Sequence, residues 1–229
     1  MKLGLVGRAP AAYDDAFMAK MASAYLEQTP WTRLRLSAVR DLVEPAPGER
    51  VLDLGSAGGA VTHFLSTFAC DVVGVDAEER AVGLAASLFP MLRFEIADAS
   101  DLPFEDARFD KVVAADLVEH LEDVTFERML GEALRVLVPG GTVSIYTPNQ
   151  RHPVEWLKDR DLLLARNATH VGLRDGRALG AALERAGFEL DRVEWRPSFI
   201  VGLRTLERLG GGSVEALRYR LCLRGRKPA

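Results

Sequence analysis

The chain has 229 residues, of which 48% are hydrophobic and 27% charged, and a formal net charge of −4. This length fits one well-buried core better than two, so we predict a single domain spanning 1–229. No apolar run approaches the roughly 18 residues needed to cross a bilayer, so we expect no stable membrane insertion. The acidic balance also disfavours general nucleic-acid binding.

The two cysteines and the start of the chain bear on the cellular compartment in which the protein is expected. Cys70 and Cys222 lie inside apolar runs and do not form a C-x-x-C pair, so we expect buried thiols rather than ligands or a disulfide. The first fifteen residues contain only a short apolar patch followed by acids, which is unlike a secretory signal. A cytoplasmic protein is expected.

A helical region precedes the first expected strand. Residues 13–44 have helical apolar spacing interrupted by Pro30, and we expect them to pack over a sheet edge, so that 1–48 form a helical cap. Short β-type runs then alternate with helical stretches, which predicts a mostly parallel sheet covered on both faces. The expected strands are 50–54, 71–75, 93–96, 110–115, 142–146, 189–195 and 216–223. The expected helices are 60–68, 78–88, 126–137 and 174–186.

Two later segments depart from this alternation. Residues 148–173 are longer than a usual connection and form a predicted substrate-side insertion, where acceptor specificity could reside. In the last segment basic residues alternate with apolar ones, which favours the solvated face of a strand over a nucleic-acid site. These basic residues are Arg218, Arg220, Arg224, Arg226 and Lys227.

The strongest local pattern is the glycine-rich turn after the first strand, 51–59. Gly55 and Gly59 let the backbone adopt positive φ and approach a ligand, while the following helix start presents unpaired N–H groups. Asp53 places a carboxylate beside this turn. A pyrophosphate would be repelled there, whereas the ammonium group of an amino-acid ligand would be attracted. A tight turn without a ligand is the alternative.

A second acid, Asp76, follows the second expected strand at a spacing typical of nucleotide-binding sites. Asp76 lies about twenty residues after Gly55, the offset at which a carboxylate can accept both ribose hydroxyls of a nucleotide. It also precedes Ala77, Glu78 and Glu79 as a helix cap would. We prefer the ribose-ligand role because of the spacing.

In these segments, over 50–195, the sequence resembles the class I S-adenosylmethionine-dependent methyltransferases, within the small-molecule group that includes ubiquinone-biosynthesis O-methyltransferases. The family's D/E-x-G-x-G-x-G motif falls on Asp53, Gly55 and Gly59, with Ala57 at the middle glycine. The resemblance implies a Rossmann-like α/β fold with a seven-stranded sheet, an antiparallel last strand and S-adenosyl-L-methionine as cofactor. It also implies ribose contacts from Asp76 and Ala77, adenine contacts from Asp98 and Ala99, and a methionine contact from Ala115.

Methyl transfer needs mainly orientation and, for a hydroxyl acceptor, a base. His120, in the family's E-H-L continuation after the fourth strand, is the candidate base, although it is also compatible with a half-buried packing role. Asp116, Glu119 and His120 could share a helix face, and ubiquinone-type relatives hold a divalent ion with a comparable E-x-x-E-H. We nevertheless predict no metal. The insertion offers further candidates for an acceptor pocket or base: Arg151, His152, Trp156 and His170.

The resemblance predicts a methyltransferase acting on oxygen or nitrogen of a small molecule, with a homodimer compatible with the sequence. Two other classes stay open: a nicotinamide-type enzyme, since 55–60 form a degenerate G-x-G-x-x-G/A, and a catalytically silent cofactor-binding scaffold. A nucleic-acid methyltransferase is disfavoured, because no N/D-P-P-Y/F tetrad follows the fourth strand.

Overall fold

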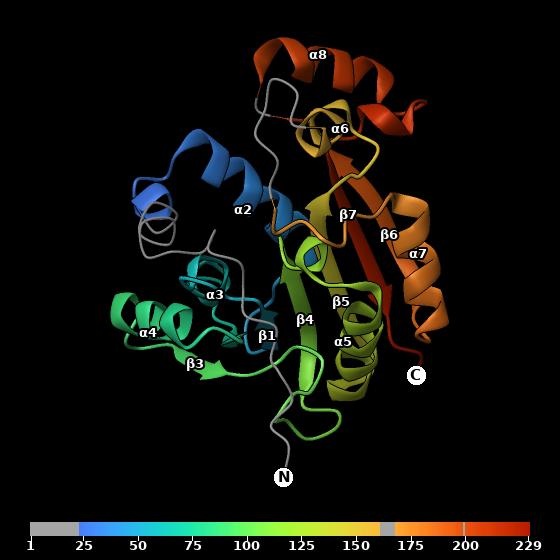
Figure 1. Ribbon diagram of the computed structural model, residues 1–229. Coiled ribbons are helices and arrows are strands. Elements are labelled where there is room, and N and C mark those ends of the chain that lie inside the picture. Colours follow the sequence, from blue (N-terminus) through green and yellow to red (C-terminus); the bar gives the residue numbers. More distant parts are fainter. Residues whose placement is uncertain (1–22, 161–167, 199) are drawn as a thin grey trace.

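Seven strands form one sheet at the centre of the molecule (Figure 1), in the order β3-β2-β1-β4-β5-β7-β6. The computed structural model describes residues 23–160, 168–198 and 200–229. The strands are β1 (Arg50–Leu54), β2 (Asp71–Asp76), β3 (Arg93–Ile96), β4 (Phe109–Ala115), β5 (Leu137–Pro148), β6 (Glu189–Arg196) and β7 (Arg220–Arg226). The β1–β2, β1–β4, β2–β3 and β4–β5 pairs are parallel, while β7 runs antiparallel to both β5 and β6. The Rossmann-like fold with an antiparallel last strand is confirmed.

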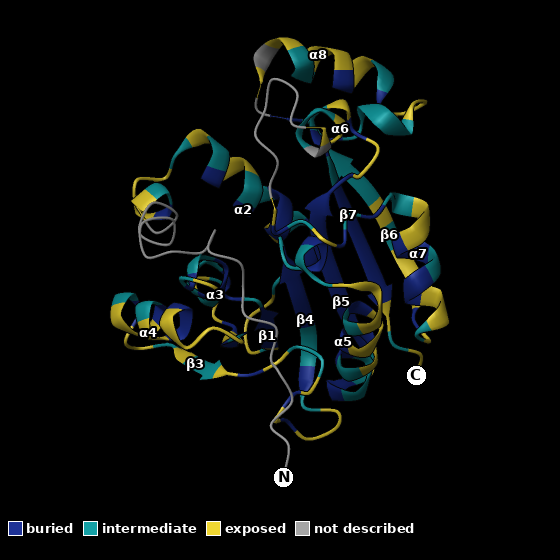
Figure 2. Cartoon of the chain, viewed as in Figure 1, coloured by how far each residue is buried: buried dark blue, intermediate teal, exposed yellow. Residues whose placement is uncertain are grey.

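Helices cover both faces of this sheet, and the central strands are its most buried part (Figure 2). The helices are α2 (Pro30–Val43), α3 (Ala60–Ser66), α4 (Glu79–Leu88), α5 (Asp123–Val136), α6 (Pro153–Asp159), α7 (Gly176–Arg185) and α8 (Val201–Gly210). On one face α5 and α7 bury Phe126 and Leu183 in a shared cluster. On the other, α2 and α3 bury Leu36, Val39 and Leu65. Both halves of the core therefore rest on amphipathic helices.

The helix α2 lies over the middle of the sheet, so the expected packing over an edge is wrong. Its apolar side chains Leu36 and Val39 share a cluster with Val113 of β4 and Cys222 of β7. The reason is the sheet order, which the chain order does not reveal: β4, β5 and β7 are interior strands. The position of α2 brings its polar residues to the carboxyl end of β4.

The last strand begins at Arg220, four residues later than expected, because Glu215–Leu217 form a 3-10 turn instead. Asn149, just after β5, holds this turn: its Nδ2 donates to the carbonyls of Glu215 and Arg218, both at 2.9 Å. Both Cys70 and Cys222 are buried free thiols, as expected.

The alternating arginines of β7 do not form a solvated face, which corrects the sequence interpretation. The side chains of Arg220 and Arg224 are only 13% and 9% exposed, and each is paired with acids from other elements. Since β7 lies between β5 and β6 with α2 packed nearby, this face of the strand is covered. Arg226, at the end of the strand, remains exposed.

Two helices not predicted from the sequence lie beyond the carboxyl end of β5, at the top of Figure 1. They are α6, inside the predicted insertion, and α8, between β6 and β7. A fully buried pair joins them: His152 Nε2 lies 3.0 Å from Glu207 Oε1, and the other Glu207 oxygen accepts the Ser198 N–H. None of the described helices is long and apolar enough to cross a membrane.

Candidate functional site

The glycine-rich turn after β1 has a left-handed backbone at three alternate residues. Gly55, Ala57 and Gly59 have φ values of 69°, 45° and 79°. A Cβ at Gly55 would lie 2.8 Å from Leu117, and one at Gly59 would lie 2.8 Å from Phe94, so both glycines are required by the packing. Ala57 adopts this conformation at a cost of about 1–2 kcal/mol. The conformation of the turn that leads into α3 is thus fixed by its backbone and its packing.

Asp53 lies at the end of β1 and is almost fully buried. It accepts a hydrogen bond of 2.7 Å from the hydroxyl of Thr62 on α3. Burial raises the pKa of Asp53 to about 7, against the opposing effects of Thr62 and Arg35. A direct contact of Asp53 with the ammonium group of a ligand stays a prediction; the observed role is to tie β1 to α3.

Asp76 joins the second strand to the glycine-rich turn. Its Oδ2 accepts the backbone N–H of Ala57 at 2.9 Å, and its Oδ1 accepts that of Glu78 at 3.0 Å. Asp76 therefore anchors the turn and holds the N-cap residue of α4, Glu78, by its backbone, while the ribose-ligand role stays a prediction. Each oxygen retains a lone pair for a further hydrogen bond. Ala77, beside it, is exposed.

The third strand ends beside the second, so the residues that follow both strands share one edge of the sheet. Asp98 is exposed, and its Oδ1 accepts the backbone N–H and the hydroxyl of Ser100, each at 2.8 Å. Ala99 is half-buried against the core. The predicted adenine-side residues are therefore accessible at the same edge as Asp76 and the turn.

The fourth strand ends in an ion-pair cluster that the sequence did not reveal. Asp116, which follows the buried Ala115, has a φ of 59° and accepts from Arg35 Nε at 2.6 Å and Arg220 Nη1 at 2.7 Å. Arg35 also donates to the carbonyl of Ala115 at 3.2 Å. Burial acts to raise the pKa of Asp116, but Arg220 and Arg35 overcome it and hold the pKa below its usual range.

His120 lies in the short 3-10 turn Val118–His120 after β4. Its Nδ1 lies 3.0 Å from the carbonyl oxygen of Thr169, which can only accept, so Nδ1 carries the proton and Nε2 is the basic nitrogen. Burial lowers the pKa of His120. The imidazole is therefore neutral near pH 7, in the form that a general base requires.

Glu119, the neighbour of His120 in the chain, is buried. Its Oε2 accepts from the Thr147 hydroxyl at 2.9 Å. Burial, together with the nearby charge of Asp116, raises the pKa of Glu119 to about 8. This side chain is thus protonated in the folded protein at neutral pH.

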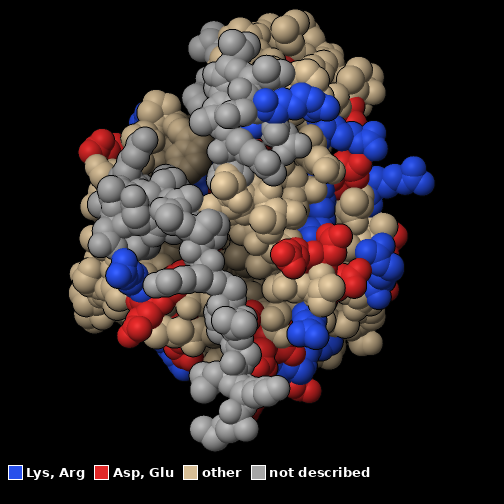
Figure 3. All heavy atoms as spheres, in the orientation of Figure 1, with Lys and Arg blue, Asp and Glu red and all other residues tan. Residues whose placement is uncertain are grey.

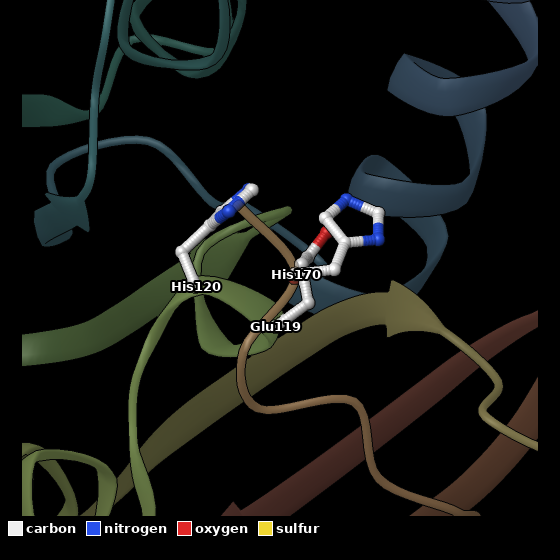
Figure 4. A group of neighbouring side chains, drawn as sticks. All are labelled: Glu119, His120 and His170. Carbon is white, nitrogen blue, oxygen red and sulfur yellow. The ribbon is translucent and has the colours of Figure 1, made fainter. Parts of the chain in front are cut away.

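Glu119, His120 and His170 form a cluster in which one ligand atom of each lies within 4.8 Å of the others. Figure 4 shows the Glu119 carboxyl pointing toward His170, with the two imidazoles on either side. The rings of His120 and His170 lie 5.1 Å apart, edge to face. Such a group could hold a divalent cation, but Asp116 is no part of it, since the arginines engage its carboxylate. The alternative set Asp116, Glu119 and His120 is thus corrected.

Of the four candidate residues named in the insertion, all in its described part, His170 reaches this site and the other three do not. His152 is fully buried against Glu207 and accepts the Val154 N–H that begins α6, so it is structural. Trp156 is half exposed beneath Arg160, and Arg151 pairs with Asp175.

Replacing Glu119 with glutamine is expected to change how stability depends on pH. Because the pKa of Glu119 in the folded state lies above the ordinary 4.5, the folded state holds a proton that the unfolded state releases. The stability contributed by this proton is fully present below about pH 4.5 and is lost as the pH rises toward 8. Glutamine cannot ionise, so the free energy of unfolding of the variant rises relative to that of the wild type by up to about 1.4 kcal/mol per pH unit across this range. Urea unfolding at pH 5, 6.5 and 8 measures the gap; a constant gap contradicts the buried neutral acid.

The sequence is similar to a family of known proteins and to several of its named members. Residues 25–193 match the family described as methyltransferase domain. A protein of Mycolicibacterium smegmatis named as a probable S-adenosylmethionine-dependent methyltransferase is 29% identical over 188 residues, which cover 82% of this chain and 70% of that protein. Tocopherol O-methyltransferase of Arabidopsis thaliana is 36% identical, over 50% of this chain and 34% of its own. Phosphoethanolamine N-methyltransferase 3 of the same plant is 32% identical, over 65% and 30%.

Solved structures show the same fold. The Haemonchus contortus phosphoethanolamine N-methyltransferase 2 in complex with S-adenosyl-L-methionine aligns with a TM-score of 0.72 at 18% identity, covering 99% of this chain and 61% of that chain. A chain of the Haloferax volcanii complex between the Trm112 methyltransferase activator and a methyltransferase aligns with a TM-score of 0.71 at 20% identity, covering 94% and 97%.

Proposed function

Because this chain belongs to the class I S-adenosylmethionine-dependent methyltransferases, we propose that it transfers a methyl group to an oxygen or nitrogen atom of a small-molecule acceptor. The cofactor part of this proposal is supported by the hydrogen bond from the Ala57 N–H to the carboxylate of Asp76. This bond fixes the glycine-rich turn beside an acid that can accept further hydrogen bonds. Family membership sets aside the nicotinamide alternative.

The cofactor supplies an electrophilic methyl group on its sulfonium centre, and the protein supplies the surroundings. We propose that the turn and Asp53 bind its methionine part together with Ala115, that Asp76 and Ala77 bind the ribose, and that Asp98 and Ala99 flank the adenine. The residues that would hold the cofactor are then Asp53, Gly55, Ala57, Gly59, Asp76, Ala77, Asp98, Ala99 and Ala115. They lie at or just beyond the carboxyl ends of β1 to β4, along one edge of the sheet.

His120 is the proposed general base. It follows β4, where the acceptor is expected, and the carbonyl of Thr169 holds it in the tautomer whose Nε2 can take a proton from a hydroxyl or ammonium group. Relatives that methylate oxygen and relatives that methylate nitrogen both match this chain, so the acceptor atom is open to either. A cytoplasmic location, a single domain and a homodimer stay predictions, as does the alternative of a silent cofactor-binding scaffold.

Calorimetric titration with S-adenosylhomocysteine and, separately, NAD tests the cofactor assignment. We expect the wild type to bind S-adenosylhomocysteine and not NAD. Asp76→Ala should weaken this binding at least about 30-fold, because hydrogen bonds from ribose hydroxyls to a carboxylate are worth about 1.5–3 kcal/mol each.

Asp76→Asn keeps the shape of the side chain and separates loss of charge from loosening of the turn. Asp71→Ala is the matched control, since Asp71 is an exposed acid at the opposite end of β2 and should leave affinity unchanged. Binding of NAD by the wild type, or of neither compound, would sink the assignment. Binding without turnover across a broad acceptor screen would favour the scaffold.

A further inference from the structure

The cluster of Arg35, Asp116 and Arg220 suggests the chemistry of the acceptor. We propose that the acceptor carries an oxyanion, a carboxylate or phosphate group, which Arg220 binds with the help of Arg35. This inference rests on the proposed function, since it concerns the acceptor half of the same site.

The sheet order places this cluster on the acceptor side. The proposed ribose and adenine contacts lie at the carboxyl ends of β2 and β3, which with β1 form one half of the sheet. Arg220 opens β7 in the other half, where it pairs in register with Pro148 at the end of β5. Arg35 reaches across from α2 to the end of β4, through its bond to the carbonyl of Ala115. The two guanidinium groups therefore meet where the cofactor half of the edge ends and the acceptor half begins.

Two cations share one anion in this cluster. Asp116 accepts from both Arg35 and Arg220, and each guanidinium side chain is 13% exposed. A further acid near Arg220, Glu155, pairs instead with Lys158 at 2.8 Å. Among the described residues, the two arginines thus share the carboxylate of Asp116 as their hydrogen-bonded acid, in a mostly desolvated position.

Arg220 also has hydrogen-bonding capacity that the protein leaves unused. Its Nε is buried and has no partner, and in the described part of the chain only its Nη1 donates a side-chain hydrogen bond. A buried donor without a partner is destabilising, so a ligand that accepts from it gains affinity. The rings of Tyr146 and Tyr219, with centroids 5.6 and 5.1 Å from the guanidinium, hold it in place.

A second arginine on the same face of β7, Arg224, has more hydrogen-bond acceptors than Arg220. Arg224 donates from Nε to Asp191 at 2.6 Å, and from Nη1 to Glu44 at 2.7 Å and to the carbonyl of Leu42 at 3.1 Å. Two acids thus surround Arg224, whereas Arg220 shares its single acid with Arg35. The free edge of a guanidinium matches a carboxylate or phosphate in two parallel hydrogen bonds. Figure 3 shows lysine and arginine side chains gathered over the α6 end of the molecule, which would favour an anionic ligand.

The test is a titration of the S-adenosylhomocysteine-loaded protein with inorganic phosphate and, in parallel, with benzoate, at constant ionic strength. We expect one saturable site for at least one of these anions. Arg220→Gln should weaken it at least about tenfold while S-adenosylhomocysteine binding is unchanged. Asp116→Asn, which removes the internal competitor for both arginines, should tighten it several-fold, an effect that mere loss of structure would not give.

Arg226→Gln is the matched control, because Arg226 lies on the same strand at the far end and should leave anion affinity within about twofold. If Arg220→Gln does not fold, Arg220→Lys keeps the charge but loses the Nε–H, and should weaken binding at least about threefold. An absence of saturable binding of either anion to the wild type, or equal binding by the Arg220 variant, overturns the inference. Failure of the wild type to bind S-adenosylhomocysteine instead overturns the proposed function and is read in a separate titration.

Discussion

Arg174→Met is expected to lower the free energy of unfolding by roughly 3 kcal/mol or more. The guanidinium donates to the backbone carbonyls of Val118, Leu121 and Gly172 at 2.7–3.0 Å and to the carboxylate of Asp123 at 2.6 Å. Methionine has a similar length but no donors, so three carbonyls in a buried region lose a charged partner.

This loss should reach the turn that carries His120 as well as the overall stability. Arg174 adds to the bonds that join this turn to the segment 169–172, which supplies the carbonyl partner of that histidine. With His120 as the proposed base, we expect a larger fall in methyl transfer than in S-adenosylhomocysteine affinity, since the proposed cofactor contacts lie elsewhere.

Urea unfolding measures the stability, and Arg185→Met is the control. Arg185 pairs with Glu127 at 3.4 Å on the surface, where both side chains are more than half exposed, so its loss should cost less than about 1 kcal/mol. If Arg174→Met costs no more than the control, the network does not hold the turn.

Asp116→Ala should also be strongly destabilising, by roughly 3 kcal/mol. The variant leaves the guanidinium groups of Arg35 and Arg220 without their shared carboxylate in a largely buried place. Breaking a buried ion pair by removing one partner costs about 3–5 kcal/mol, and the lower end applies because Asp116 keeps about a fifth of its side chain exposed.

Asp191→Ala is the matched control for this variant. Asp191 also receives two arginines, but Arg224 keeps Glu44 and a backbone carbonyl when Asp191 is lost. We expect a cost at least about 1.5 kcal/mol smaller, measured by the same unfolding titration. Equal costs would mean that Asp116 does not act as the sole counterion of its pair.

Much of the geometry of the proposed cofactor side could be predicted because its signals are local. Apolar runs identified the strands, and the spacing of Asp53, Gly55 and Asp76 follows from one strand, one turn and the next strand. Their convergence then follows from parallel pairing, since the carboxyl ends of neighbouring parallel strands meet at one edge. The contact of Asp76 with the turn is an unpredicted detail of the same geometry.

The proposed acceptor side could not be predicted in this way, because its contacts join residues far apart. Arg35 and Arg220 lie 81 and 104 positions from Asp116. An alternating strand pattern shows that two faces differ but not which face meets water, so the arginines of β7 were assigned to the wrong surroundings. α8 has regularly spaced leucines at 203, 206 and 209, a helical signal in a stretch of the chain for which no element was predicted.

The buried pair of His152 and Glu207 has a consequence for how relatives of this protein can diverge. It joins α6 and α8, which lie in two separate segments of the chain on either side of β6. A substitution of either partner leaves the other unsatisfied in the interior, so the two residues are constrained to change together. An exchange of these segments between homologues should therefore transfer α6 and α8 as a set, because either helix alone would lack its buried partner.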